Sequence, residues 1–358
     1  MVVMIIAAVL AVITVFFVPI DKSYIGYFDF KTLACLFSVL AVVCALRGIK
    51  FFYILARKTI RTFKNLKICI LALCYITFIG SMLIANDMAL LTFLPLGFYV
   101  LKATNNEKYM AFTFIMQNIS ANLGGMLTPF GNPQNLYLYS KFNIPTGEFM
   151  GIMALPFAVS IFLITLCCII FVKNKPLELK GKDVTLDKKR AGIYLLLFLL
   201  SIIMVFRVIP YYIGFFIILI SLLILDKEAI KKVDYPLLLT FFFFFIFSGN
   251  LARIDVIKEF FSSLLMKNTL LYTILSCQFI SNVPSSILLS QFTTNYKELL
   301  LGVNIGGAGT LIASLASLIT LREYTAHNPK GTLKYIGLFS VINFSFVIIL
   351  YIITSSVL

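Results

Sequence analysis

Apolar segments about as long as a membrane is thick recur along this chain, separated by short basic stretches. Residues 2–20 and 30–46 are the first two, and each is long enough to span a bilayer as a helix. Hydrophobic residues fill 61% of the 358 positions and charged residues 13%, whereas a soluble domain carries roughly 25% charged residues. So much apolar surface needs lipid as its solvent. The sequence therefore predicts an all-α polytopic membrane protein surrounded by membrane lipid.

The charge and motif content argues against several other functions. The net charge of +15 fits the basic cytoplasmic loops of a membrane protein, and no soluble basic domain is present to bind nucleic acid. One histidine, His327, and seven cysteines without a Cys-x-x-Cys pair give no basis for a zinc or haem site. The chain also lacks a P-loop motif. We therefore expect no cofactor and no enzyme activity.

Two segments of the first half do not fit simple spans. Residues 47–67 hold seven basic residues and no acid, with apolar residues between them at near-helical spacing. This pattern predicts a cytoplasmic helix lying in the membrane interface. Residues 69–101 carry one charge, Asp87, and 33 residues are too many for one span and too few for two. We therefore expect a re-entrant hairpin that turns at Ala85-Asn86-Asp87.

Glycines and prolines interrupt the next apolar segment, residues 109–140. Proline removes a helical donor and glycine loosens the backbone, so this segment is predicted to be a broken helix, unwound between about Gly124 and Asn135. A span at 149–172 follows. Residues 173–190 then hold seven basic residues and three acids, which predicts a cytoplasmic linker.

The second half shows the same odd segments in the same order. A second hairpin is expected to turn near Ser281-Asn282-Val283-Pro284, and glycines interrupt the helix that follows it. The expected segments are spans at 191–207, 211–226 and 235–251, a hairpin over 268–296, a broken helix over 299–321 and a final span at 334–356.

A short alignment indicates that the halves arose by duplication. The stretch from Asn122 to Thr128 aligns with that from Asn304 to Thr310, and four of 14 aligned positions are identical. Such weak identity at matching architectural positions is typical of transporters with internal repeats.

Counting crossings gives the relative orientation of the halves. With residues 47–67 and 173–190 in the cytoplasm, the first hairpin opens to the cytoplasm and the second to the outside. The repeats, residues 1–172 and 191–358, are therefore expected to be inverted. The count is nine crossings plus two hairpins, with the N-terminus in the cytoplasm and the C-terminus outside.

Two hairpin turns and two helix breaks would form a polar site if they met near mid-membrane. Half-helix N-termini offer N–H groups and a partial positive charge, and unwound carbonyls offer oxygens suited to Na⁺. An anion and a cation could then be held side by side. The polar side chains available there are Asn86, Asp87, Asn118, Asn122, Thr128, Asn132, Gln134, Asn135, Gln278, Ser281, Asn282, Asn304, Thr310, Ser314 and Ser317.

Simpler structural roles compete with these functional ones. The glycine pairs could serve close helix packing, and Asn86 and Asn282 could cap the second arms of the hairpins. Asp87 could be stabilised by a helix N-terminus, or it could ligate Na⁺ or take up a proton. Both the structural and the functional interpretation of Asp87 remain open at this point.

The motifs at the turns and breaks resemble those of the ion transporter superfamily, which includes citrate-type and divalent anion:sodium symporters, arsenite permeases and some sodium/proton antiporters. The most specific stretch runs from Thr128 to Asn135, and the resemblance covers essentially the whole chain. In the divalent anion branch each turn reads Ser-Asn-Thr. Ala85, Asp87 and Val283 depart from that pattern, which leaves the substrate class open.

The resemblance implies an elevator-type carrier, usually a homodimer, with Na⁺ at each hairpin and break and the substrate between the turns. The implied substrate-binding residues are Asn86, Asn282, Ser281, Thr128, Pro129, Asn132, Thr310 and Ser314. The implied cation-binding residues are Asp87, Asn86, Asn122, Gly125, Gly131, Asn135, Asn282, Asn304, Gly307 and Ser317.

The leading hypothesis is Na⁺- or H⁺-coupled transport of a small anion across the plasma membrane, with a carboxylate as the first candidate substrate. The alternatives within transport are efflux of arsenite or another oxyanion, and sodium/proton exchange through Asp87. A membrane-embedded enzyme or a receptor is the remote alternative, because Asp87 is the one acid away from the ends of the predicted membrane-embedded segments.

Overall fold

The computed structural model describes residues 2–177 and 185–358. The secondary-structure elements of these residues are all helices. The β-type pairing recorded for these residues is an isolated bridge between Asn65 and Pro176. Residues 178–184 of the predicted linker lie outside the described residues. The all-α prediction is confirmed for the part of the chain that the structure describes.

Each predicted span, hairpin and broken helix coincides with a helix or a pair of helices. The first half contains α1 (Val2–Phe17), η1 (Lys22–Tyr27), α2 (Phe30–Gly48), α3 (Phe51–Ile60), α4 (Leu66–Ile84), α5 (Asn86–Ala103), η2 (Glu107–Tyr109), α6 (Met110–Gly124), η3 (Gly125–Leu127), α7 (Pro133–Lys141) and α8 (Thr146–Phe171).

The second half adds the following helices. They are α9 (Lys188–Val205), α10 (Tyr211–Leu225), α11 (Lys227–Lys231), α12 (Tyr235–Leu251), α13 (Asp255–Lys267), α14 (Thr269–Ile280), α15 (Asn282–Leu289), α16 (Tyr296–Gly306), α17 (Leu315–His327), η4 (Pro329–Gly331) and α18 (Thr332–Ser355).

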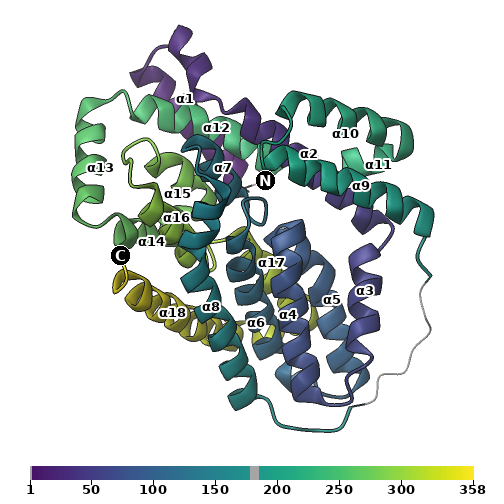
Figure 1. Cartoon of the computed structure of the whole chain (residues 1–358). Helices are drawn as coiled ribbons and strands as arrows, with labels where there is room; N and C mark the ends of the chain where they lie inside the picture. Colours follow the sequence, from purple (N-terminus) through teal and green to yellow (C-terminus); the bar gives the residue numbers. More distant parts are fainter. Residues whose placement is uncertain (1, 178–184) are drawn as a thin grey trace.

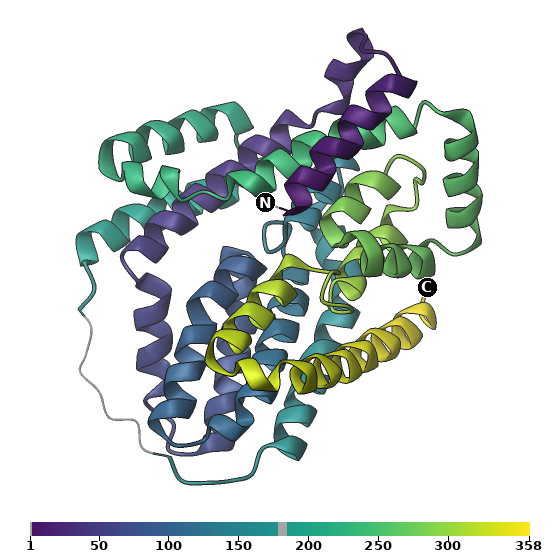
Figure 2. The same ribbon diagram turned by 180° about the vertical axis from the view of Figure 1, so that it is seen from behind.

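The helices form two groups, which both ribbon views separate (Figures 1 and 2). Helices α1 and α12 pack together, α2 packs against α9, α10 and α11, and this group lies across the top of Figure 1. Below it, α4, α5 and α6 pack together and α17 packs on α5 and α6, while α14, α15 and α16 pack together. Both hairpins and the second broken helix thus belong to the lower group, while α7, the second part of the first broken helix, packs on α15 and α16 and also on α2 of the upper group.

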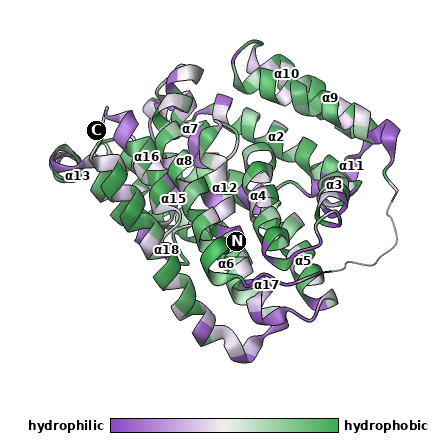
Figure 3. Ribbon diagram, turned by 60° about the horizontal axis from the view of Figure 1, so that its bottom comes forward, coloured by the Kyte–Doolittle hydropathy of each residue, from purple (hydrophilic) through white to green (hydrophobic). Residues whose placement is uncertain are grey.

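Apolar side chains cover much of the outer surface, as a membrane protein requires. Figure 3 shows hydrophobic residues along most helices and hydrophilic ones gathered at helix ends and in loops. Helix α8 and the segment Pro329–Ser355 are apolar, yet only 22% and 28% of their most apolar windows are buried. Phe162 and Val341 point outward from these helices. In water such faces would be costly, so they are suited to lipid.

By length and composition, four helices of the described chain could cross a membrane. They are α2, α4, α8 and the segment ending in α18, and α12 with α13 is a fifth candidate, bent by 100°. Helices α1 and α10 are apolar but shorter, at 16 and 15 residues. The predicted nine crossings therefore stay a prediction, because they count short and broken helices as spans.

The helix predicted over 47–67 is shorter than expected. Helix α2 continues to Gly48, Lys50 adopts a left-handed φ of 58°, and α3 covers Phe51–Ile60. Asn65 then caps the start of α4 by accepting from the amide of Lys67 at 2.9 Å. The buried face of α3 packs on α2, α4 and α5, so it contacts protein where lipid was expected.

Helix α13 was missed by the sequence reasoning. It follows α12 after a sharp bend, and its exposed face carries Val256, Phe260 and Met266. Charged residues interrupt its apolar positions, so hydropathy alone does not mark it as a span.

Candidate functional site

A cavity of about 510 Å³ lies between the two hairpin turns and the two helix breaks. Helices α1 and α12 close another side with apolar side chains such as Leu10 and Phe244. The polar and chain-break residues that line it are Asn86, Asp87, Pro133, Gln134, Asp234, Thr240, Ser281, Asn282, Val283, Pro284, Ile312, Ser314 and Leu315. Segments about 200 residues apart in the sequence therefore share one chamber.

The cavity is lined by the N-terminal ends of four helices. Asn86 is the first residue of α5, Pro133 of α7, Asn282 of α15 and Leu315 of α17, and all four residues line the cavity. The first N–H groups of a helix have no partner within it, and together with the macrodipole they place about half a positive charge there. Such ends attract an anion without a basic side chain.

Each hairpin turns through a single strained residue. Ala85 has φ 65° and ψ 152°, and Ser281 has φ 76° and ψ 157°. This region is essentially restricted to glycine, so each residue costs about 1–3 kcal/mol of strain. The same unusual conformation occurs at both predicted turns, and the residue that follows it in each case, Asn86 or Asn282, lines the same cavity.

The matched threonines of the two halves make matched bonds. Thr128 Oγ1 donates to the carbonyl of Met82 at 2.8 Å, and Thr310 Oγ1 donates to the carbonyl of Gln278 at 3.0 Å. Met82 and Gln278 each lie three residues before the strained turn residue of their hairpin. The two hydroxyls therefore fasten each helix break to the first arm of its hairpin, and neither residue lines the cavity.

The two glycines of each pair have different surroundings, and the halves agree. A Cβ on Gly124 would overlap the carbonyl of Phe78, and one on Gly306 would lie 3.1 Å from Cα of Ile274. The first glycine of each pair thus permits close packing on the first hairpin arm, as the structural alternative proposed.

The second glycine of each pair lies against a side-chain amide instead. A Cβ on Gly125 would overlap Oδ1 of Asn132, and one on Gly307 would lie 2.7 Å from Nδ2 of Asn282. These two glycines therefore leave room for polar atoms at the site.

Buried amides connect the first break to helix α16. Asn304 Nδ2 donates to Asn135 Oδ1 at 2.7 Å, and Asn304 Oδ1 accepts from Asn132 Nδ2 at 3.3 Å and from Gln134 Nε2 at 3.5 Å. Asn86 Nδ2 donates to Asn122 Oδ1 at 3.2 Å, which joins the first turn to helix α6. The bonds of Asn304 tie the two halves of the chain together.

Several oxygens around the first break have the chemistry of Na⁺ ligands. Asn132 Oδ1 and Gln134 Oε1 are buried without a hydrogen-bond partner among the described atoms. A Cβ on Gly125 would meet Asn132 Oδ1 and, at 2.8 Å, the carbonyl oxygen of Gly131. A buried acceptor without a donor is costly, whereas a hard cation takes such carbonyl and amide oxygens as ligands. These residues therefore fit a small cation.

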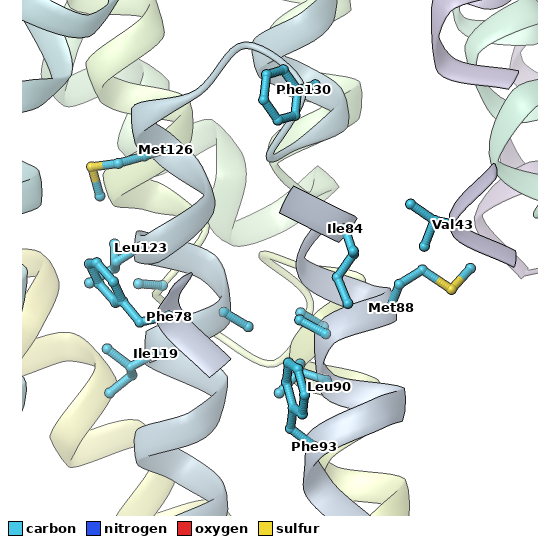
Figure 4. Close-up of a cluster of buried hydrophobic side chains, with 14 of the residues drawn as sticks. Val43, Phe78, Ile84, Met88, Leu90, Phe93, Ile119, Leu123, Met126 and Phe130 are labelled. Atoms are coloured by element: carbon cyan, nitrogen blue, oxygen red, sulfur yellow. The ribbon is translucent and has the colours of Figure 1, made fainter. Parts of the chain in front are cut away.

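Hydrophobic packing holds this region in place. Figure 4 shows Phe78 and Ile84 of α4, Met88 and Phe93 of α5 and Leu123 of α6 buried around the first hairpin. Such a tightly packed core fixes the hairpin turn and the helix break relative to each other.

The predicted site residues fall into two shells. Asn86, Asp87, Ser281, Asn282 and Ser314 line the cavity. The others lie behind it in the helix breaks and their hydrogen-bond network: Asn122, Gly125, Thr128, Pro129, Gly131, Asn132, Asn135, Asn304, Gly307, Thr310 and Ser317.

Sequence reasoning missed Asp234. This residue caps α12 by accepting from the amide of Leu237 at 3.0 Å, and it lines the cavity together with Asp87. It directly precedes the span predicted at 235–251, so the sequence alone puts it outside the membrane. Its position just before a predicted helix identifies Asp234 as a cap. Nothing in the sequence places α12 beside the hairpin turns, so its place at the cavity could not be predicted.

The comparison with known families decides the class of this protein. The sequence model of the citrate transporter family matches residues 1–298. The chain belongs to this family. The resemblance to the ion transporter superfamily, based on the turn and break motifs, is thereby confirmed.

Two relatives of known sequence agree with the family assignment. An uncharacterized transporter of Methanocaldococcus jannaschii is 37% identical over 312 residues, which are 86% of this chain and 85% of the relative. The inner membrane protein YbiR of Escherichia coli is 28% identical over 313 residues, 86% of this chain and 83% of the relative. The family and the names of these relatives point to a multi-pass membrane transporter and not to an enzyme.

Proposed function

We propose that this protein is a cation-coupled secondary transporter of a small anion, with carboxylates as its substrate class. The observation that carries the proposal is the convergence of four helix N-termini on one cavity, from α5, α7, α15 and α17. Among the described residues that line it, none is Lys or Arg. The attraction for an anion would therefore come from helix ends and amides.

The unpartnered oxygens of Asn132 and Gln134 support Na⁺ as the coupling ion. They lie next to the N-terminus of α7, so a bound cation there would also raise the positive potential that an anion meets. The cation and the anion would then favour each other's binding, which is the energetic basis of coupling.

We further propose that residues 1–172 and 191–358 are inverted repeats that work by an elevator-type movement. The matched bonds of Thr128 and Thr310 and the matched strain at Ala85 and Ser281 support a common origin. In this proposal the lower group of helices moves against the group containing α2 and α12, in a homodimer of the plasma membrane.

The decisive experiment measures flux in proteoliposomes. Liposomes containing the purified protein are expected to accumulate radiolabelled citrate or a smaller carboxylate when an inward Na⁺ gradient is imposed. Accumulation should collapse when the gradient is dissipated, and empty liposomes serve as the control. Carboxylate flux that is absent with both Na⁺ and H⁺ gradients would refute the proposal.

Sodium/proton exchange is the second candidate, because two carboxylates, Asp87 and Asp234, line the cavity. The same liposomes, loaded with a pH-sensitive dye, separate the two functions. An exchanger would change the internal pH when Na⁺ is added without any carboxylate, whereas a symporter would not.

The inverted topology predicts opposite labelling of two engineered cysteines. In a variant without the seven native cysteines, Lys175→Cys should react with an impermeant maleimide from the cytoplasmic side and Gly147→Cys from the outside. Both positions are exposed, and a Cβ on Gly147 meets no atom within 4 Å. Labelling of both from the same side would rule out this topology.

A further inference from the structure

A second pocket, of about 380 Å³, lies at the corner where α2 ends and α3 begins, against α5. It shares no lining residue with the cavity described above. Its lining residues are Arg47, Lys50, Phe52, Tyr53, Arg57, Leu91, Thr92 and Pro95. Three of these are basic and none is acidic.

The three cations of this pocket lack an anionic partner among the described residues. No ion pair of the described chain includes Arg47, Lys50 or Arg57. The Arg47 side chain contacts a sulfur, since its Nη1 lies 3.7 Å from Sδ of Met88. Like charges gathered around a hollow without an acid repel one another, which an anion placed between them would relieve.

Arg57 is the most firmly positioned of the three cations. Its Nε is buried and has no hydrogen-bond partner among the described atoms. Its guanidinium lies 5.2 Å from the ring centroid of Tyr99, a cation–π contact that fixes its position. A guanidinium held beside a hollow, without a carboxylate partner among the described residues, is suited to the oxygens of a phosphate.

We propose that this pocket binds the phosphate of an anionic phospholipid headgroup. A lipid is favoured over free phosphate because apolar side chains flank the basic residues. Leu91 lines the pocket and is 39% exposed, and Leu55, on the neighbouring helix α3, is 56% exposed. Acyl chains could cover these side chains while the phosphate pairs with the cations. Basic pockets between membrane helices recognise anionic headgroups in this way.

The proposal rests on the placement of this corner at the membrane surface and does not depend on the transported substrate. The pocket is built from the basic segment 47–67 and from α5, the helix that carries Asn86 and Asp87 at its start. A bound headgroup would therefore connect the corner of α2 and α3 to the second arm of the first hairpin.

The test measures lipid binding to the purified full-length protein by native mass spectrometry. Phosphatidylglycerol is titrated in detergent, with phosphatidylcholine as the neutral-lipid comparison. The affinity of the variant Arg47→Gln/Lys50→Gln/Arg57→Gln for phosphatidylglycerol should fall by a factor of about ten or more. The matched control Lys58→Gln/Lys64→Gln/Lys175→Gln removes the same charge at exposed positions outside the pocket and should stay within about twofold of wild type.

Equal losses in both triple variants would overturn the proposal, because net charge alone would then explain binding. Inorganic phosphate should compete only weakly with the lipid, and equally strong binding of phosphate alone would assign the pocket to a soluble anion. If the triple variant fails to fold, Arg47→Gln alone, at an exposed side chain, gives the same test. Unchanged affinity for phosphatidylglycerol in that folded variant would also refute the proposal.

Discussion

Replacing Asn304 by leucine is expected to reduce cation-driven uptake by more than about 100-fold while the protein still inserts. Asn304 accepts from Asn132 and Gln134 and donates to Asn135, so leucine would leave three buried amides without this partner. Each lost partner costs about 1–3 kcal/mol. The first break would relax, and the oxygens proposed to hold the cation would lose their arrangement. Initial rates of radiolabelled uptake in proteoliposomes measure the effect.

Asn343→Leu is the matched control for this substitution. Both asparagines are buried, and each donates to the backbone carbonyl four residues before it: Asn304 to that of Leu300 at 2.8 Å and Asn343 to that of Phe339 at 2.9 Å. Asn343 lies in α18 and does not line the cavity. This variant should keep most of its transport rate. Normal uptake by Asn304→Leu, or equal loss in both variants, would show that the amide network is not specific to the site.

Local sequence signals predicted the turns and breaks well because their causes are local. Proline and glycine act on the backbone where they stand, so the amino-acid sequence alone locates the break after Gly124 and the one after Gly306. Segment length, together with Asn86 and Asp87, also locates the turn at Ala85, but the strain at this residue was not predicted. An alanine at positive φ gives no sequence signal, since only tertiary packing holds it there.

Contacts between segments that are distant along the chain could not be predicted from the sequence. The pattern marked Thr128 and Thr310 as site residues because they recur in both halves, yet each hydroxyl is bonded to a hairpin carbonyl. Their recurrence reflects a repeated structural bond. In the same way, the part played by α1, α12 and Asp234 in closing the cavity depends on how the two helix groups pack, which no single segment encodes.

Asp87→Asn is expected to abolish the dependence of transport on the cation gradient while leaving exchange of the anion across the membrane. Asp87 lies in the first turn of α5, lines the cavity, and has one carboxylate oxygen buried without a hydrogen-bond partner among the described atoms. A charge within a membrane costs about 2.5 kcal/mol or more, so it is seldom retained without a role. Uptake with and without an imposed Na⁺ or H⁺ gradient, compared with gradient-free exchange, measures the coupling.

The alternative is that Asp87 only stabilises the helix end, and the structure makes the two roles separable. No side chain caps α5, and the amide of Asp87 is already bonded to Oδ1 of Asn86 at 3.0 Å, so the carboxylate is not engaged as a cap. Asp255 is a matched control, because it also lies in the first turn of a helix, is exposed and does not line the cavity. Asp255→Asn should leave coupling unchanged. If Asp87→Asn also retained near-normal, gradient-driven uptake, the carboxylate would act through the helix dipole alone, and coupling would rest on the oxygens of Asn132 and the glycine carbonyls beside it.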